Sequence, residues 1–210
     1  MSTENSAVLP EQLAQQLRAS ILKQIEAPGS TITEAAVALR FGVARPTARQ
    51  AIDRLVADGI LRREAHHAAR VPELSRDDIV DLFDNRAVIE SAAIAALRSI
   101  PEDALDAHRS ILAESDVADG DFAEADIAFH RALVAAQPSP RLTRMHALLM
   151  GEIELCIGQV QVGQLLTASE VAAQHRVILD ATTAVEPERA AQLTRDHIRG
   201  SRDALLDRTN

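Results

Sequence analysis

The chain has 210 residues, of which 47% are hydrophobic but only 2% aromatic, and it contains no Trp or Tyr. This length allows one large domain or two small ones, and we expect two. A composition poor in aromatic residues favours helices over a β-sandwich. The single cysteine, Cys156, excludes an internal disulfide, and no apolar stretch approaches the roughly 18 residues of a membrane span. We therefore expect a mainly α, cytoplasmic protein with no membrane partner.

The charge is divided unevenly along the chain. The formal net charge is −9, which argues at first against a partner rich in phosphate. Residues 1–75, however, carry nine Lys or Arg against eight Asp or Glu, whereas residues 76–210 carry 13 against 23. The N-terminal part is thus about +1 and the remainder about −10. This distribution permits nucleic-acid binding by the N-terminal part alone.

The N-terminal part reads as a helix-turn-helix preceded by one further helix. Apolar residues recur at helical spacing from Pro10 and stop near Pro28-Gly29, which predicts a first helix. Thr33 can cap a short second helix, and Gly42 is placed where a left-handed residue would reverse the chain. A third helix begins after Ala44 and runs over residues 45–56. Its buried stripe leaves four polar residues at the exposed N-terminal end, the end that a recognition helix inserts into the major groove: Arg45, Thr47, Arg49 and Gln50.

A wing and a linker follow. Residues 60–63 and 69–72 can pair as two short strands around a loop that contains His66 and His67. The sequence therefore predicts a winged helix-turn-helix DNA-binding domain over residues 1–72 and a linker over 73–76. An all-helical bundle follows over 77–210, with Ser75 or Asp77 as the first cap. Its helical patterns cover roughly 76–98, 102–117, 119–136, 139–164, 168–184 and 187–208.

The stretch from Thr33 to Val71 resembles the GntR family of bacterial regulators. The family pattern appears as Glu34, Ala38, Gly42-Val43-Ala44-Arg45, Pro46-Thr47, Arg49-Gln50-Ala51-Ile52, Leu55 and Gly59-Ile60-Leu61. The chain departs from the pattern at Ala44, where most members carry a capping Ser or Thr, at Ala35, where many carry Arg, and in a wing without the usual glycines. The resemblance implies contacts with operator DNA from Arg45, Thr47 and Arg49. The wing residues His66 and His67 could contact DNA or simply face solvent.

The C-terminal part resembles the ligand-binding domain of the FadR branch of that family, the all-helical type called FCD, in its short, six-helix version. The signature is an Arg followed by an acidic residue and an Ala-rich helix, here Arg86, Glu90 and residues 92–97. The resemblance implies a homodimer that binds a palindromic operator, most often as a repressor. It also implies that a small effector controls operator affinity.

Four residues in this part have the types and spacing of a metal site. Asp126 and His130 are four residues apart, so on a helix both lie on one face, and His175 and His197 lie on the last two predicted helices. Residue types alone leave open whether these are ligands or ordinary surface and hydrogen-bonded histidines. The family resemblance favours a metal, because metal-binding members use an Asp, a His four residues later and two further His on the last two helices. One carboxylate and three imidazoles suit Zn²⁺ best, with Ni²⁺ or Mn²⁺ as alternatives.

The expected effector is a small organic acid that completes the metal shell, with Arg86 pairing its carboxylate. Arg86 could instead pair with Glu90, four residues on. His108 and His146 lack matching partners in the sequence and are interpreted as surface residues. Two alternatives to a metal-dependent sensor stay open at this point. The first is a metal-dependent enzyme that uses the Asp/His₃ site to activate water, although we expect no enzyme. The second is a purely structural metal.

Overall fold

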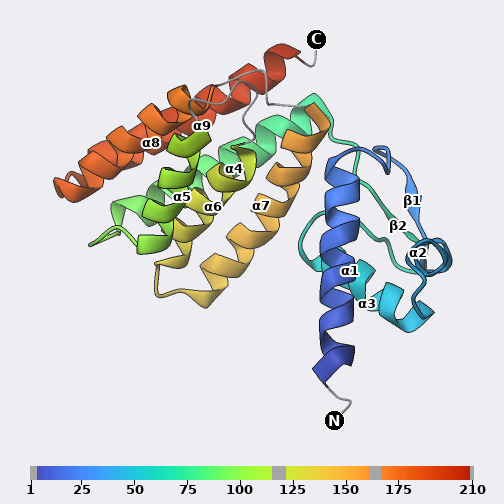
Figure 1. Cartoon of the computed structure of the whole chain (residues 1–210). Coiled ribbons are helices and arrows are strands. Elements are labelled where there is room, and N and C mark those ends of the chain that lie inside the picture. The colour runs from blue at the N-terminus through green and yellow to red at the C-terminus, as the bar shows by residue number, and fades with distance from the viewer. Residues whose placement is uncertain (1–3, 115–121, 161–166, 209–210) are drawn as a thin grey trace. The chain divides into compact units, whose positions relative to one another are not determined.

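The computed structural model describes residues 4–114, 122–160 and 167–208. The chain folds into two compact units, Met1–Leu74 with Glu154–Gln159, and Ser75–Ile153 with Val160–Asn210. Helices dominate both units, as the composition predicts (Figure 1). Parts of three predicted helices lie outside the described residues: residues 115–117, 119–121 and 161–164.

The first helix, α1 (Glu4–Leu22), is shorter at its C-terminus than its sequence suggests. Gln24 adopts a left-handed φ of 56°, its amide bonds to the carbonyl of Ile21, and the amide of Ile25 bonds back to Ser20. These two bonds are the Schellman pattern that ends helices, usually with a glycine in the left-handed position. The prediction that this helix continues to Pro28-Gly29 is therefore wrong, because a non-glycine residue ends it earlier.

The helix-turn-helix consists of α2 (Glu34–Phe41) and α3 (Arg45–Ala57). The Thr33 hydroxyl accepts a hydrogen bond of 3.2 Å from the amide of Ala36 and so caps α2. Gly42 ends α2 in the left-handed conformation, with a φ of 65°. Ala44 precedes α3 and provides no side-chain cap. The predicted cap of α2 and the predicted turn are confirmed.

Apolar side chains from all three helices form one core beneath α3. α1 and α2 both pack against α3, whose Ile52 side chain is completely buried. The core is made by Leu13, Leu17, Ile21, Val37, Ala48, Ala51, Ile52, Leu55, Ile60, Leu61 and their neighbours. This packing leaves the opposite face of α3 exposed.

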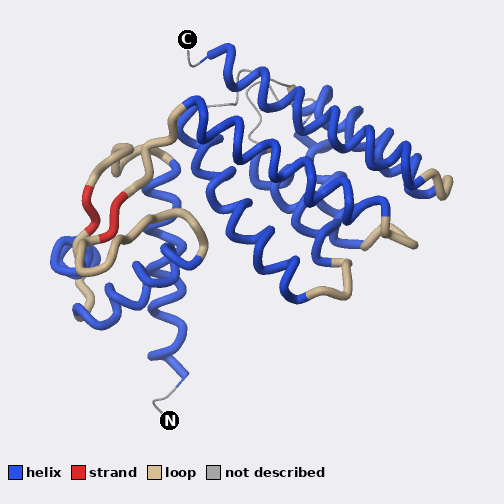
Figure 2. The backbone as a smooth tube through the Cα atoms, turned by 180° about the vertical axis from the view of Figure 1, so that it is seen from behind, coloured by secondary structure: helices blue, strands red, loops and turns tan. Residues whose placement is uncertain are grey.

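The strand that ends the wing pairs with a segment that the sequence pattern did not predict to be a strand. β2 (Ala69–Arg70) pairs antiparallel with β1 (Thr31–Ile32), which precedes the helix-turn-helix, in the register Thr31 to Arg70 and Ile32 to Ala69 (Figure 2). The predicted pairing between residues 60–63 and 69–72 is present as a single bridge, in which Arg62 and Arg70 exchange two backbone hydrogen bonds of 2.9 and 2.8 Å. The expected two-stranded element exists, but its strands are β1 and β2.

The second unit is a bundle of six described helices, one of which contributes Glu154–Gln159 to the first unit. They are α4 (Arg76–Ala95), α5 (Glu102–Glu114), α6 (Ala123–Ala135), α7 (Pro140–Val160), α8 (Ala168–Thr183) and α9 (Pro187–Arg208). α4 lies along α9, α5 packs against α6 and α8, and α8 packs against α9 (Figure 1). Ser75 starts α4 and Thr167 starts α8, each in a capping box with the acidic residue three positions later. Of the two caps expected for α4, Ser75 is therefore the correct one.

Apolar side chains of α4, α5, α6, α8 and α9 fill the bundle interior. Phe129, Leu133 and Ile178 are nearly inaccessible to solvent. No helix in the described part of the chain combines the length and the low charge that crossing a bilayer requires. The buried face of α6 that carries Phe129 also carries His130, so the core and the candidate site share the same helix face.

Candidate metal centre

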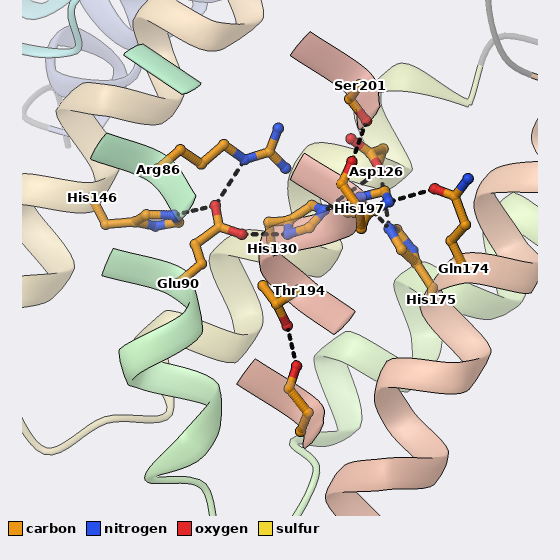
Figure 3. Close-up of polar contacts among 11 residues, drawn as sticks. Arg86, Glu90, Asp126, His130, His146, Gln174, His175, Thr194, His197 and Ser201 are labelled. Atoms are coloured by element: carbon orange, nitrogen blue, oxygen red, sulfur yellow. Dashed lines mark hydrogen bonds and ion pairs between the residues drawn. The ribbon is translucent and has the colours of Figure 1, made fainter. Parts of the chain in front are cut away.

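Three helices bring four potential metal ligands together. Asp126 and His130 lie one turn apart on α6, His175 lies on α8 and His197 lies on α9 (Figure 3). One ligand atom from each of the four residues falls within a group whose members lie within 4.8 Å of one another. The three imidazoles are buried. The sequence could place only the first two residues on one face, because the other two are 45 and 67 positions beyond His130 along the chain.

The ligand atoms have the spacing of a metal coordination shell. His197 Nε2 lies 3.1 Å from His130 Nε2 and 3.3 Å from His175 Nε2. Asp126 Oδ1 lies 3.2 Å from His175 Nε2 and 3.7 Å from His130 Nε2. Nitrogen and oxygen ligands at their usual distance from a zinc ion are roughly 3.3–3.6 Å apart when the site is tetrahedral. The four residues therefore enclose a point from which each ligand atom can reach one ion.

Each imidazole is oriented by a further side chain. His130 Nδ1 lies 2.5 Å from Glu90 Oε2, and His197 Nδ1 lies 2.7 Å from Gln174 Oε1. Both oxygens only accept hydrogen bonds, so both Nδ1 atoms carry the proton and both Nε2 atoms present lone pairs to the centre. The ring of His175 stacks on Phe129, with centroids 3.8 Å apart. Nδ1 partners like those of His130 and His197 are typical of histidines that bind metals.

The centre contains polar atoms that need a cation. The buried Asp126 Oδ1 has the Nε2 atoms of His175 and His130 beside it, at 3.2 and 3.7 Å, and the unprotonated Nε2 atoms of His130 and His197 face each other at 3.1 Å. Burial alone would raise the pKa of Asp126, but the adjacent His130 and His175 outweigh it and hold the pKa well below its usual value. A carboxylate that stays ionised among converging lone pairs is costly to bury unless a positive charge compensates it. The residues present therefore fit a divalent metal ion.

The histidine pKa values also reflect this arrangement. Burial lowers the pKa of His175 to about 4 and that of His197 well below its usual value. Burial and Arg86 lower the pKa of His130 as well, but the carboxylates of Glu90 and Asp126 outweigh them and raise it. Two of the three imidazoles are thus kept in the neutral form that metal binding needs.

A second buried group lies directly behind His130. The carboxylate of Glu90 accepts hydrogen bonds from Arg86 Nε and from His146 Nε2, both at 2.9 Å (Figure 3). Arg86 is 1% exposed, and its Nη2 atom is buried without a hydrogen-bond partner. The alternative pairing of Arg86 with Glu90 is therefore present, and it leaves one end of the guanidinium free.

Two interpretations of the sequence are wrong. His146 and His108, expected at the surface, are 2% and 8% exposed. His146 bonds to Glu90, and the ring of His108 lies 6.3 Å from that of His175. Neither has a matching residue nearby in the sequence, because the side chains beside them come from other helices. Glu90 was recognisable as a possible partner of Arg86, but nothing in the sequence linked it to His130.

The four polar residues at the start of α3 lie away from the core of their unit. Arg45, Arg49 and Gln50 are exposed and Thr47 is half-buried. The Arg49 side chain is 66% exposed and lies 3.8 Å from both Glu34 and Asp53. Long, exposed ion pairs of this kind are weak. The guanidinium is therefore available to a stronger anionic partner.

The predicted wing histidines lie in an exposed turn. His66 has a left-handed φ of 66°, and His67 Nδ1 donates a hydrogen bond of 2.9 Å to the carbonyl of Ala65. Both side chains are exposed. The turn thus presents two imidazoles to solvent on the segment between Arg62 and β2.

Comparison with known proteins places both units in described families. Residues 9–71 match the family described as bacterial regulatory proteins, gntR family, and residues 81–200 match the FCD domain. The chain is 28% identical over 175 residues to the "Probable D-xylose utilization operon transcriptional repressor" of Paenarthrobacter nicotinovorans, covering 81% of this chain and 76% of that one. It is 28% identical over 209 residues to the HTH-type transcriptional regulator BphR of Paraburkholderia xenovorans (strain LB400), covering 94% and 85%.

Solved structures share the fold of the whole chain. A GntR transcriptional regulator from Rhodococcus sp. RHA1 superposes with a TM-score of 0.78 at 23% identity, covering 94% of this chain and 97% of that one. E. coli McbR/YncC gives a TM-score of 0.71 at 19% identity, covering 96% and 99%. The matched families and named relatives are regulators, which leaves the enzyme alternative without support. The chain therefore belongs to the GntR family of transcriptional regulators, with an N-terminal helix-turn-helix domain and a C-terminal FCD effector-binding domain.

Proposed function

We propose that this regulator senses a small organic acid at a divalent metal ion held by Asp126, His130, His175 and His197, and that the acid controls its affinity for operator DNA. The observation that carries the proposal is the convergence of four ligand atoms within 4.8 Å in the bundle interior. Zinc is the preferred ion, because one carboxylate and three imidazoles are ligands it commonly takes, with nickel or manganese as alternatives. When bound, the ion supplies positive charge and a coordination position for an anion.

Charge at the site favours an anionic effector. With neutral imidazoles, a divalent ion and Arg86 contribute three positive charges, while Glu90 and Asp126 contribute two negative ones. One positive charge is therefore uncompensated in the bundle interior, where unpaired charges are costly. A carboxylate neutralises it, and Arg86 Nη2, which lacks a partner, is a donor suited to that group. Arg86 can therefore pair with Glu90 through Nε and bind the carboxylate of the effector through Nη2.

On the DNA side, we propose that α3 enters the major groove with Arg45, Thr47, Arg49 and Gln50 toward the bases and phosphates. The exposure of this end of α3 supports the proposal. His66 and His67 are proposed to approach the DNA from the wing turn. The functional form is proposed to be a homodimer, because two helices of this kind, one per half-site, match the two-fold symmetry of a palindromic operator. Repression is the proposed outcome, as in the named xylose-operon relative.

Metal binding is tested by titrating the metal-free protein with Zn²⁺ against a chromophoric chelator. We expect one ion per chain, and a large loss of affinity in Asp126→Asn, which removes the charge but keeps the shape of the side chain. Asp180→Asn is the matched control, since Asp180 lies on the exposed face of α8 and pairs with Arg176. Equal zinc affinity in all three proteins would overturn the proposed ligand set.

The effector is tested by a thermal-shift screen of small carboxylic acids with and without Zn²⁺, because ligands of the folded state raise the melting temperature. We expect acids to stabilise the zinc-loaded protein and to lose this effect with Arg86→Lys, which keeps the charge but loses the guanidinium fork. If chelation lowers the melting temperature but leaves acid binding unchanged, the metal is structural and the sensing proposal fails.

DNA binding is tested by gel shift on the promoter next to the regulator's own gene. Arg49→Ala is expected to abolish specific binding, whereas Arg176→Ala, a substitution of an exposed arginine on α8, is expected to leave it unchanged. Unchanged binding in Arg49→Ala would contradict the role assigned to α3.

A further inference from the structure

Glu90 has three partners on three helices. Its own helix α4 supplies Arg86, α6 supplies His130 and α7 supplies His146 (Figure 3). The distances are 2.9 Å from Arg86 Nε and from His146 Nε2 to Oε1, and 2.5 Å from His130 Nδ1 to Oε2. The side chain is 1% exposed. A buried carboxylate with this many donors is both satisfied and held in one position.

This position determines the chemistry of His130. A carboxylate can only accept hydrogen bonds, so His130 Nδ1 must donate, and in the neutral ring the lone pair is then on Nε2. Nε2 is the atom that faces Asp126 and His197. Had Nδ1 been without an acceptor, the ring could have carried its proton on Nε2, where it would block a metal ion.

We infer that Glu90 is a positioning residue for the metal centre: it fixes His130 as the Nδ1-protonated tautomer with Nε2 directed at the ion, while Arg86 and His146 hold the carboxylate in place. The inference rests on the proposed metal site. It also gives a role to His146, which holds the Glu90 carboxylate. His146 lies 56 positions beyond Glu90, so no sequence pattern links it to the centre. It also connects the ion to Arg86, the residue proposed to bind the effector, through a single carboxylate.

Removing Glu90 alone would leave the Arg86 charge buried without a partner and could unfold the bundle. The variant Arg86→Met/Glu90→Leu avoids this problem, because it removes both charges and replaces them with apolar side chains of similar size. The matched control is Asp84→Leu/Arg202→Met, which removes the ion pair between Asp84 on α4 and Arg202 on α9, neither of which belongs to the proposed centre. Circular dichroism and thermal unfolding establish that each variant is folded.

Two measurements then test the inference. The first is the zinc affinity of each protein, determined by chelator competition in the absence of any organic acid. We expect Arg86→Met/Glu90→Leu to bind Zn²⁺ about 10–100-fold more weakly than the unsubstituted chain, the usual effect of losing an outer partner of a metal-binding histidine. The control Asp84→Leu/Arg202→Met is expected to bind within a few-fold of the unsubstituted chain.

The second measurement reads the tautomer directly, from the ¹⁵N shifts of labelled histidine in the metal-free protein at alkaline pH. We expect His130 to carry its proton on Nδ1 in the unsubstituted chain and in Asp84→Leu/Arg202→Met, and to lose that preference in Arg86→Met/Glu90→Leu. If Arg86→Met/Glu90→Leu folds with unchanged zinc affinity and an unchanged His130 tautomer, the role of Glu90 is overturned. Failure of the unsubstituted chain to bind Zn²⁺ would instead overturn the metal proposal itself, together with the role of Glu90 toward the ion.

Discussion

Mild acid is expected to destabilise the metal-free protein through its buried histidines. The perturbation is a change from about pH 7 to about pH 5 in the presence of a chelator. In the folded chain burial lowers the pKa of His175 to about 4. In the unfolded chain a histidine titrates near 6.5. Because the unfolded state takes up the proton first, stability is lost as the pH falls below about 6.5, and the loss stops growing near the folded-state pKa of about 4.

The size of the effect follows from the same two pKa values. At about pH 5 His175 alone lowers the free energy of unfolding by roughly 2 kcal/mol. His197, with its pKa also lowered, acts in the same direction, whereas His130, with its pKa raised, acts in the opposite one. The lowered pKa values of Asp126 and Glu90 affect stability only below about pH 4, where these carboxyls titrate in the unfolded chain. The contribution of His175 to the loss of stability over this interval is therefore roughly 2 kcal/mol.

The assay is urea unfolding followed by circular dichroism at several pH values in EDTA. It compares the unsubstituted chain with His175→Asn, which does not titrate, and with His66→Asn as a control in the exposed wing turn. We expect the free energy of unfolding to fall with pH less steeply in His175→Asn than in the other two proteins. If all three show the same pH dependence between about pH 7 and 5, the buried imidazole is not the cause of the acid sensitivity.

Three further predictions concern the DNA-binding unit. Ile52→Ala, at a fully buried position of α3, should lower the free energy of unfolding by about 2–5 kcal/mol in urea titrations. A loss below about 1 kcal/mol would contradict the described core. Gly42→Ala adds a Cβ that meets no atom within 4 Å, so the only strain comes from the left-handed φ of 65°. The expected loss in the free energy of unfolding is about 1–2 kcal/mol in the same assay. No loss would show that residue 42 does not adopt the left-handed conformation. Operator affinity should fall steeply with salt in gel shifts, and Arg45→Ala should lower the slope of log affinity against log salt by about 1 if this exposed side chain meets a phosphate; an unchanged slope would remove that contact.

Local signals in the sequence determined much of the fold. The cap at Thr33 and the left-handed Gly42 fix α2, and the capping residue Ser75 starts α4 where the linker was expected to end. These features act over a few residues, so composition and spacing are enough to recognise them. The same holds for Asp126 and His130, which share a face because a helix repeats every 3.6 residues.

Some local expectations nevertheless failed. The first helix ends at Leu22, just before Gln24, a residue type that rarely adopts a left-handed φ, while the stronger stop signal at Pro28-Gly29 lies beyond the helix. The strand before α2 was also missed, because Thr31–Ile32 is only two residues long and is defined by its pairing with β2. A strand this short has no periodicity of its own to detect.

In the candidate metal centre, the sequence determines some features and only the tertiary structure determines the others. By itself the sequence determined which residue types are present and that Asp126 and His130 face the same way. Only the packing of α6, α8 and α9 decided that His175 and His197 meet them, and only the packing of α4 and α7 brought Glu90 and His146 behind His130. The physical reason is that a buried polar group must find its partner wherever the fold supplies one, and here the partners are tens of residues away. Helical periodicity indicates which face a residue occupies, but the tertiary structure determines which faces meet.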